Sequence, residues 1–176
     1  MANLFARSTD GLDTDSGATW ALANATISKI APNGGSFSRD AAGDTIYVSD
    51  NHAESTAASI TLTSAGTGAS PVRCLCVDDT GDPASPTTLA TTGTVTTTGA
   101  SNVNFTGVVY WYGIAFKVGT GASSASAVLG SNTSLTAVLT YESCAFEILN
   151  TGTASASIQV GSNTNIAAIS AVVTWI

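Results

Sequence analysis

The feature that most constrains this 176-residue chain is a run of residues that returns about 30 positions later. Val128–Thr133 reappears as Gln159–Thr164, so that Asn132 recurs as Asn163, 31 positions on. Just upstream, Phe116 and Phe146 occupy matching places in two similar apolar runs, 30 positions apart. A period of this size is typical of stacked units, each of which buries an apolar face on the next. The repeat therefore predicts a stack of similar units.

From Gly43 onward the chain reads as short alternating strands between turns, beginning with Asp44–Val48, Ser59–Thr63 and Val72–Val77. Ile46 and Leu75 lie 29 positions apart, which fits the same period. About three strands per period favour a parallel β-helix over a β-sandwich, which would show hairpin turns and no recurring run. This all-β prediction places Phe116 over Phe146 and Val128 over Ile158.

Residues 1–42 differ in sequence pattern from the rest of the chain. A turn-rich loop over Asp10–Gly17 is followed by apolar residues at helical spacing over Trp20–Ile30. We expect 1–42 to form an arm, a loop and a short capping helix within 18–31, and 43–176 to form the stack. At the other end the apolar strand Val172–Ile176 is left open, so that either further sequence or a partner subunit is expected to cover it.

Composition excludes several classes of function. Charged residues make up 10% of the chain and hydrophobic residues 44%, the opposite of a disordered protein. The net charge is −7 and the five cations are scattered, so no basic patch is available for nucleic acid or for an anionic membrane. Neither a signal peptide nor a bilayer-spanning run is visible, and membrane insertion is not expected.

Two runs, Ser8–Ala25 and Ala42–Val48, resemble the opening of right-handed parallel β-helix proteins of the pectin-lyase-like superfamily. In that family a Gly-x-Asp loop and a short helix cap the coil, and Gly-Asp-Thr-Ile begins its first turn. The motifs cover about residues 7–48, and the repeat covers the C-terminal part. The resemblance implies a right-handed coil. It implies no activity, because the superfamily holds polysaccharide lyases and hydrolases as well as non-enzymatic phage spikes and fibres.

The Thr-, Ser-, Ala- and Gly-rich, charge-poor composition is similar to the virion members of this superfamily. We therefore expect a non-enzymatic structural protein of a bacteriophage, a capsid decoration (cement) or spike protein on the virion surface, made in the host cytoplasm without a signal peptide. The expected partners are two further copies in a homotrimer, other virion proteins such as the major capsid protein, and cell-surface glycans. The alternatives are a tail-fibre or tailspike segment, a calcium-dependent polysaccharide lyase or depolymerase, and a secreted adhesin.

Acidic residues give the first candidate site. Asp78, Asp79 and Asp82 form the densest cluster, and carboxylates are the ligands that calcium prefers. The resemblance implies that a lyase would use such a cluster together with a cation, for which Arg73 stands nearest before it. The same residues are also typical of an ordinary turn, and we favour that interpretation. No cofactor is therefore expected, and a calcium site is the alternative.

Three smaller groups have plainer interpretations. Asp10, Asp13 and Asp15 lack the further ligands of a calcium loop and are predicted to hold the cap. His52, between Asp50 and Glu54, has no accompanying nucleophile motif and is predicted in a surface turn, and no catalytic residue is assigned. The three cysteines are predicted to be small buried thiols: Cys74, Cys76 and Cys144.

Three consecutive aromatic residues give the second candidate site. On a strand Tyr110 and Tyr112 share one face and Trp111 takes the other, so one of the two faces belongs to the core. The other face could be a sugar-stacking platform or an oligomer interface, and we favour the interface. The predicted interface residues are Tyr110, Trp111, Tyr112, Trp175 and Ile176.

Overall fold

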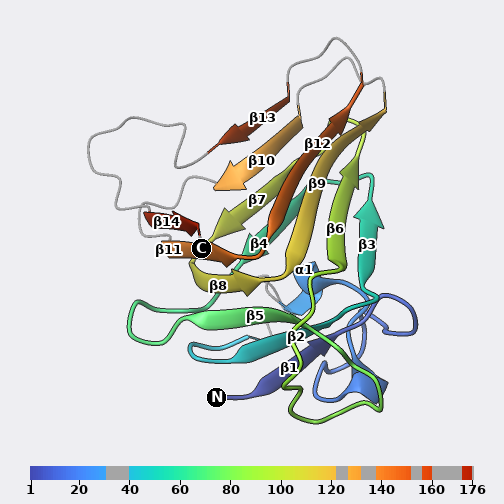
Figure 1. The fold of residues 1–176 in the computed structure, drawn as a ribbon, viewed down its shortest axis with the longest axis vertical. Coiled ribbons are helices and arrows are strands. Elements are labelled where there is room, and N and C mark those ends of the chain that lie inside the picture. Colours follow the sequence, from blue (N-terminus) through green and yellow to red (C-terminus); the bar gives the residue numbers. More distant parts are fainter. Residues whose placement is uncertain (31–39, 122–126, 132–137, 152–155, 160–171, 176) are drawn as a thin grey trace.

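The computed structural model describes residues 1–30, 40–121, 127–131, 138–151, 156–159 and 172–175 (Figure 1). These residues form fourteen strands, a 3-10 turn η1 (Trp20–Leu22) and a short helix α1 (Ile27–Ile30). The strands are arranged in three sheets whose paired strands are all parallel. The all-β prediction is therefore confirmed.

Along the chain, successive strands from the second strand onward belong to the three sheets in turn. The first contains β1 (Asn3–Ala6), β2 (Thr45–Ser49), β5 (Val72–Val77), β8 (Val108–Tyr112), β11 (Val138–Glu142) and β14 (Val172–Trp175). The second contains β3 (Ala53–Thr56), β6 (Gly93–Thr98), β9 (Ile114–Gly121) and β12 (Ala145–Asn150). The third contains β4 (Ile60–Thr63), β7 (Val103–Thr106), β10 (Ala127–Ser131) and β13 (Ala156–Gln159). From β2 to β11 each strand therefore pairs with the strand three places later in the chain.

The registers test the predicted repeat residue by residue. Phe146 lies opposite Phe116, as predicted, with ring centroids 5.6 Å apart. The predicted pairing of Val128 with Ile158 is wrong by one residue, because Leu129 lies opposite Ile158.

The offset between Ile46 and Leu75 also misses the register by one residue, because Cys74 is the partner of Ile46. A slip of one position exchanges the two faces of a strand. Ile46 and Cys74 accordingly point into the core, whereas Leu75 lies on the outer face and is only half-buried.

The main core lies between the three sheets. In the first sheet a ladder of buried residues crosses five strands, from Leu4 through Ile46, Cys74 and Trp111 to Tyr141. Phe105 on β7 faces this ladder from the third sheet and is fully buried. Cys74 and Cys76 are buried free thiols, as predicted, and Cys144 packs against the core while half-buried. In the described part of the chain no helix is long and apolar enough to cross a membrane.

A sharp corner separates the first sheet from the second at Gly113. Here the apolar run Val108–Val118 divides into β8 and β9. The φ angle of Gly113 is 73°, and a Cβ atom there would lie 2.0 Å from the carbonyl oxygen of Ala90. Only glycine fits such a left-handed, crowded position.

The capping segment differs from the single helix predicted within 18–31. It is divided into η1 and α1, because Asn24 pairs like a strand residue with Ala6. The Asn24 side chain also donates hydrogen bonds to the carbonyl oxygens of Leu12 and Asp15. The four-residue α1 buries Ile27 and Ile30 in the main core. The predicted arm, moreover, supplies β1, which pairs with β2 as the first strand of the stack.

Candidate functional site

The outer face of the first sheet carries the features that suggest a function. One outward row runs from Phe5 through Tyr47, Leu75 and Tyr112 to Glu142, and the next row includes Arg73, Tyr110 and Thr140. These side chains alternate with the buried ladder, as expected of strands. Four residues of the two outward rows, Phe5, Tyr47, Tyr110 and Tyr112, are aromatic, which is unusual for a face that points away from the core.

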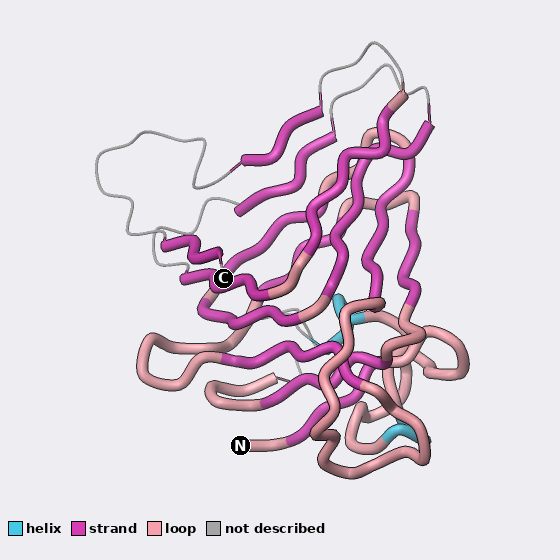
Figure 2. The backbone as a smooth tube through the Cα atoms, viewed as in Figure 1, coloured by secondary structure: helices cyan, strands magenta, loops and turns pink. Residues whose placement is uncertain are grey.

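The long loop between β5 and β6, residues 78–92, folds back over the first part of this face (Figure 2). The Trp20 indole Nε1 donates a hydrogen bond to the Pro83 carbonyl oxygen at 3.0 Å, and Asn3 Nδ2 donates to that of Ala84 at 3.1 Å. Phe5 and Trp20, with ring centroids 4.8 Å apart, are buried in a small second core together with Ala23 and Val77. The loop thus leaves the face open only beyond Leu75.

Arg7 anchors this loop. Its Nη1 donates to Asp82 at 2.6 Å and to Asp79 at 3.2 Å, while its Nε donates to Asp10 at 2.6 Å. The guanidinium carbon lies 5.5 Å from the centre of the Trp20 ring. Burial alone would lower the pKa of Arg7, but the hydrogen bonds to the three carboxylates raise it above its ordinary value.

This arrangement does not form a calcium site from the predicted acidic cluster. Asp79 and Asp82 bind Arg7, whereas the half-buried Asp78 accepts hydrogen bonds from the Thr80 hydroxyl and, at 2.9 Å, from the Thr80 backbone nitrogen, and these lower its pKa. No group of three metal-ligating side chains converges anywhere among the described residues. The described carboxylates therefore do not fit the ion, and Arg73 is not brought to them.

Arg7 and its partners Asp10, Asp79 and Asp82 form the Arg7 cluster, and the Asp50 carboxyl, which is within hydrogen-bonding reach of Asp79, adds a further negative charge to it. Burial first, and then the charges of Asp79 and Asp78, raise its pKa. The folded state therefore holds a proton on Asp50 more tightly than the unfolded chain does. The contribution of Asp50 to the free energy of unfolding accordingly grows as the pH falls through this raised pKa.

Replacing Asp50 with asparagine is expected to raise the free energy of unfolding by about 0.5 kcal/mol at neutral pH, because a repelled charge is removed. The gain should shrink in mildly acidic solution, where the natural carboxyl is protonated. Urea unfolding of both proteins at the two pH values measures it. A Glu147→Gln variant, which removes a carboxylate outside the cluster, is the control, and an Asp50→Asn gain that grows with acidity would contradict the assignment.

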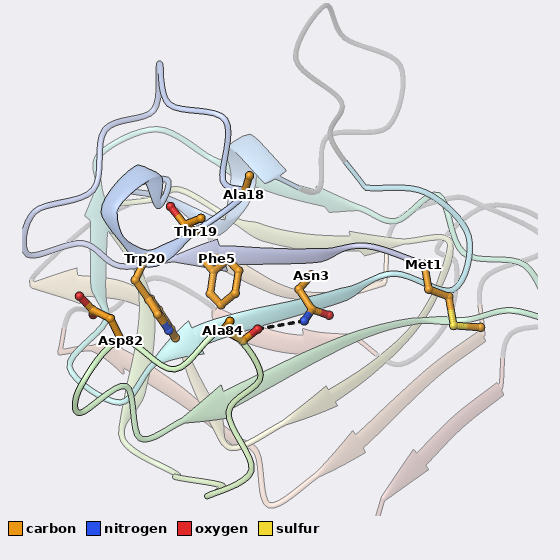
Figure 3. A pocket seen from close by; sticks show the side chains of 8 residues that line it. All are labelled: Met1, Asn3, Phe5, Ala18, Thr19, Trp20, Asp82 and Ala84. Atoms are coloured by element: carbon orange, nitrogen blue, oxygen red, sulfur yellow. Dashed lines mark hydrogen bonds between the residues drawn. The ribbon is translucent and has the colours of Figure 1, made fainter.

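A cavity of about 430 Å³ lies beside the Arg7 cluster, between β1, η1 and the 78–92 loop (Figure 3). Figure 3 shows Phe5 and Trp20 side by side in its wall, with Asn3 bonded to Ala84 at one side and Asp82 at the other. The Asp82 carboxylate is already bound to Arg7. The cavity is therefore a gap under the loop with no uncommitted charge at its rim.

A groove of about 550 Å³ lies farther along the same face, and we call it the Arg73 groove. It is lined mainly by apolar and aromatic side chains, with Arg73 and Thr140 as polar groups; the lining includes Pro71, Arg73, Leu75, Leu89, Val108, Tyr110, Val138 and Thr140. The Tyr110 hydroxyl donates to Glu142, and burial together with this contact raises the pKa of Tyr110 to about 12. Arg73 is exposed, and no carboxylate in the described part of the chain pairs with it.

The predicted interface residues fall on both sides of the first sheet. Tyr110 and Tyr112 are half-buried and point outward, where a partner could reach them. The assignment of Trp111 to an interface is wrong, because its side chain is 1% exposed and packs on Phe105 and Phe116 in the core.

The other two predicted interface residues lie at the C-terminal end. Trp175 lies on β14 opposite Tyr141, and Ile176 lies outside the described residues.

The predicted turn around His52 is present, since the His52 nitrogen donates to the Ser49 carbonyl oxygen at 3.0 Å, but the surface position of His52 is wrong. His52 and Glu54 are both buried, since β3 directs Glu54 inward in register with Val95. Glu54 accepts hydrogen bonds from the backbone nitrogen of Ile27 at 2.8 Å and from the Ser28 hydroxyl at 3.3 Å. This carboxylate therefore holds the first residue of α1, and its role is structural.

Comparison with family models, with curated proteins and with solved structures found no match for this chain. An open apolar groove with one unpaired cation is suited to binding. Arg7, which organises the neighbouring acidic loop, is the residue that the sequence patterns did not single out.

Proposed function

We propose that this chain is a structural protein of a bacteriophage particle, a capsid decoration or spike protein displayed on the virion surface. The observation that carries the proposal is the open half of the first sheet, where Tyr110 and the exposed Leu89 line the Arg73 groove and Tyr112 points outward from the same strand as Tyr110. Contiguous apolar surface of this kind usually marks a contact between proteins. The resemblance of the opening residues to phage spikes supplies the virion context.

The proposed architecture is a right-handed parallel β-helix of about 30 residues per turn. Its support is the pairing of each strand from β2 to β11 with the strand three places later, in parallel, in each of three sheets. Parallel strands joined by a crossover in one sheet are right-handed in nearly all proteins. Residues 78–92 would then be an insertion that lengthens one turn.

The proposed assembly is a homotrimer that contacts the major capsid protein or another virion protein, with cell-surface glycans as possible further ligands. The protein would be made in the host cytoplasm without a signal peptide. Closed cyclic symmetry is the usual arrangement of identical chains, and the threefold order rests on the resemblance alone. In this proposal the outward tyrosines lie at or beside the contact between copies.

The trimer is expected to sediment at about three times the chain mass of 17.5 kDa when the protein is at micromolar concentration. The reason is that the outer face of the first sheet is too apolar to remain fully hydrated. Analytical ultracentrifugation over a dilution series measures the mass. A species that stays monomeric at every concentration would contradict self-assembly.

The alternatives are a tail-fibre or tailspike segment, a calcium-dependent polysaccharide lyase, and a secreted adhesin. The lyase is the main enzymatic rival, although Arg73 lines the groove while Asp79 and Asp82 bind Arg7. Incubation with anionic polysaccharides, with and without calcium, should produce no unsaturated sugar ends. Their formation, and its loss in Arg73→Ala or Asp78→Ala, would establish the lyase instead. A gene position beside capsid or tail genes would exclude the adhesin.

A further inference from the structure

We propose that copies of this protein join head to tail, with the loop of residues 9–17 of one copy seated in the Arg73 groove of the next. We call this segment the Leu12 loop. The inference rests on the proposed self-assembly and names the two surfaces that would make the contact. Each surface carries an exposed apolar residue and a charge that lacks a partner within the described chain.

The groove side offers an apolar slot with a cation. Leu89 is 49% exposed on one wall, and the rest of the lining includes the apolar or aromatic side chains of Leu75, Val108 and Tyr110. Arg73 stands among them on β5 without a paired carboxylate in the described part of the chain. In a protein with a net charge of −7, an unpaired arginine on an apolar surface selects an acidic, apolar partner segment.

The Leu12 loop has that chemistry. Leu12 is 59% exposed, and Leu22, which is 45% exposed, lies beside the loop because its carbonyl oxygen accepts a hydrogen bond from the Gly17 backbone. The loop is built rather than loose: the Asp15 nitrogen donates to the Leu12 carbonyl at 2.9 Å, and the Leu12 nitrogen donates to that of Ala23 at 3.0 Å. It therefore presents a preorganised apolar tip.

The charge beside this tip is also uncommitted. Asp10 binds Arg7, and Asp13 accepts hydrogen bonds from the backbone and hydroxyl of Thr26. Asp15, by contrast, has no side-chain partner in the described structure, and the turn brings it next to Leu12. Asp15 is thus the carboxylate that the loop can offer to Arg73 of another copy.

The two surfaces lie at opposite ends of the first sheet. The segment that carries the Leu12 loop follows the C-terminal end of β1, whereas Gly68 and Pro71 of the groove precede β5 (Figure 1). The contact joins two different patches of the chain. Used once between neighbouring copies it closes into a ring, as in the proposed trimer, or continues as a filament, whereas a twofold dimer would use it twice.

Charge reversal with compensation tests this contact. Arg73→Glu and Asp15→Arg are each expected to raise the Kd of self-association at least tenfold, about 1.4 kcal/mol, and the double variant should recover most of the loss. Leu12→Ser, which changes a side chain that is 59% exposed, should weaken association to a similar degree. Sedimentation over a dilution series measures all four proteins, with Lys117→Met as a matched control that removes a cation elsewhere.

Disulfide capture tests the same contact directly. In a Cys144→Ser background, mixing Leu12→Cys chains with Leu89→Cys chains under oxidation should give a cross-linked pair, whereas neither chain alone should.

Assembly that is unchanged in Arg73→Glu and Leu12→Ser, or a double variant that remains dissociated, would overturn the inference and leave self-assembly standing. A wild-type protein that is monomeric at all concentrations would overturn both, and a complex of the wild type with an anionic sugar in the groove would assign Arg73 to that ligand instead.

Discussion

Replacing Phe105 with alanine is expected to lower the free energy of unfolding by about 4 kcal/mol. Its ring is fully buried on β7 and makes edge-to-face contacts with Trp111, Phe116 and Tyr141, at centroid distances of 5.8, 4.8 and 5.6 Å. These partners lie on the first and second sheets, so the one ring joins all three. Truncation would leave a cavity lined by rigid strands that cannot collapse into it.

Equilibrium unfolding in urea measures this loss, with Tyr112→Ala as the matched control. Tyr112 lies on β8 next to Trp111, but it points outward and is half-buried, so its truncation should cost about 1 kcal/mol. A loss of less than about 2 kcal/mol for Phe105→Ala would mean that the three sheets do not close around this ring. Equal losses for the two variants would mean the same.

The sequence allowed the strand content and the period to be predicted, because alternating residues and a repeat of about 30 positions are local signals. It was less reliable for register. Cys74, which is the true partner of Ile46, and its neighbour Leu75 are both apolar, so hydropathy alone could not decide which of them faces the core. A register error of one residue exchanges the two faces.

The two missed strands have a physical explanation. β1 is a four-residue run whose burial depends on β2, about 40 positions later. β3 directs the acidic Glu54 inward, which a hydropathy pattern marks as surface; its burial depends on the backbone of Ile27 and the hydroxyl of Ser28. Such partners are set by tertiary structure and have no signature at the strand itself.

The candidate site was predictable only in part. Alternation on one strand correctly divided Tyr110 and Tyr112 from Trp111, but it could not tell which of the two faces was the core. The role of Arg7 was out of reach, since its acidic partners Asp79 and Asp82 lie 72 and 75 positions away, on a loop that folds back over β1. Pairings of that kind follow from the path of a long loop.

Replacing Arg7 with methionine is expected to lower the free energy of unfolding by about 3 kcal/mol. The guanidinium and the Asp79 carboxylate are 13% and 10% exposed, and methionine keeps most of the packing while leaving that carboxylate without its cation. The more exposed Asp10 and Asp82 contribute little to the loss. The variant Lys117→Met, which removes the partly exposed ion pair with Glu147, should cost about 0.5 kcal/mol and serves as the control.

Two measurements separate the loss of charge pairing from a general loss of packing. In a double-mutant cycle, Arg7→Met combined with Asp79→Asn should be more stable than Arg7→Met alone, because the stranded charge is gone. Hydrogen exchange in Arg7→Met should speed up first at Asp82 and Ala90, whose amides bond to carbonyl oxygens of Asp79 and Cys76 within or beneath the 78–92 loop. Exchange that speeds up uniformly over the three sheets would show that Arg7 supports the whole stack, since anchoring of the loop alone would confine the change to the surface it covers.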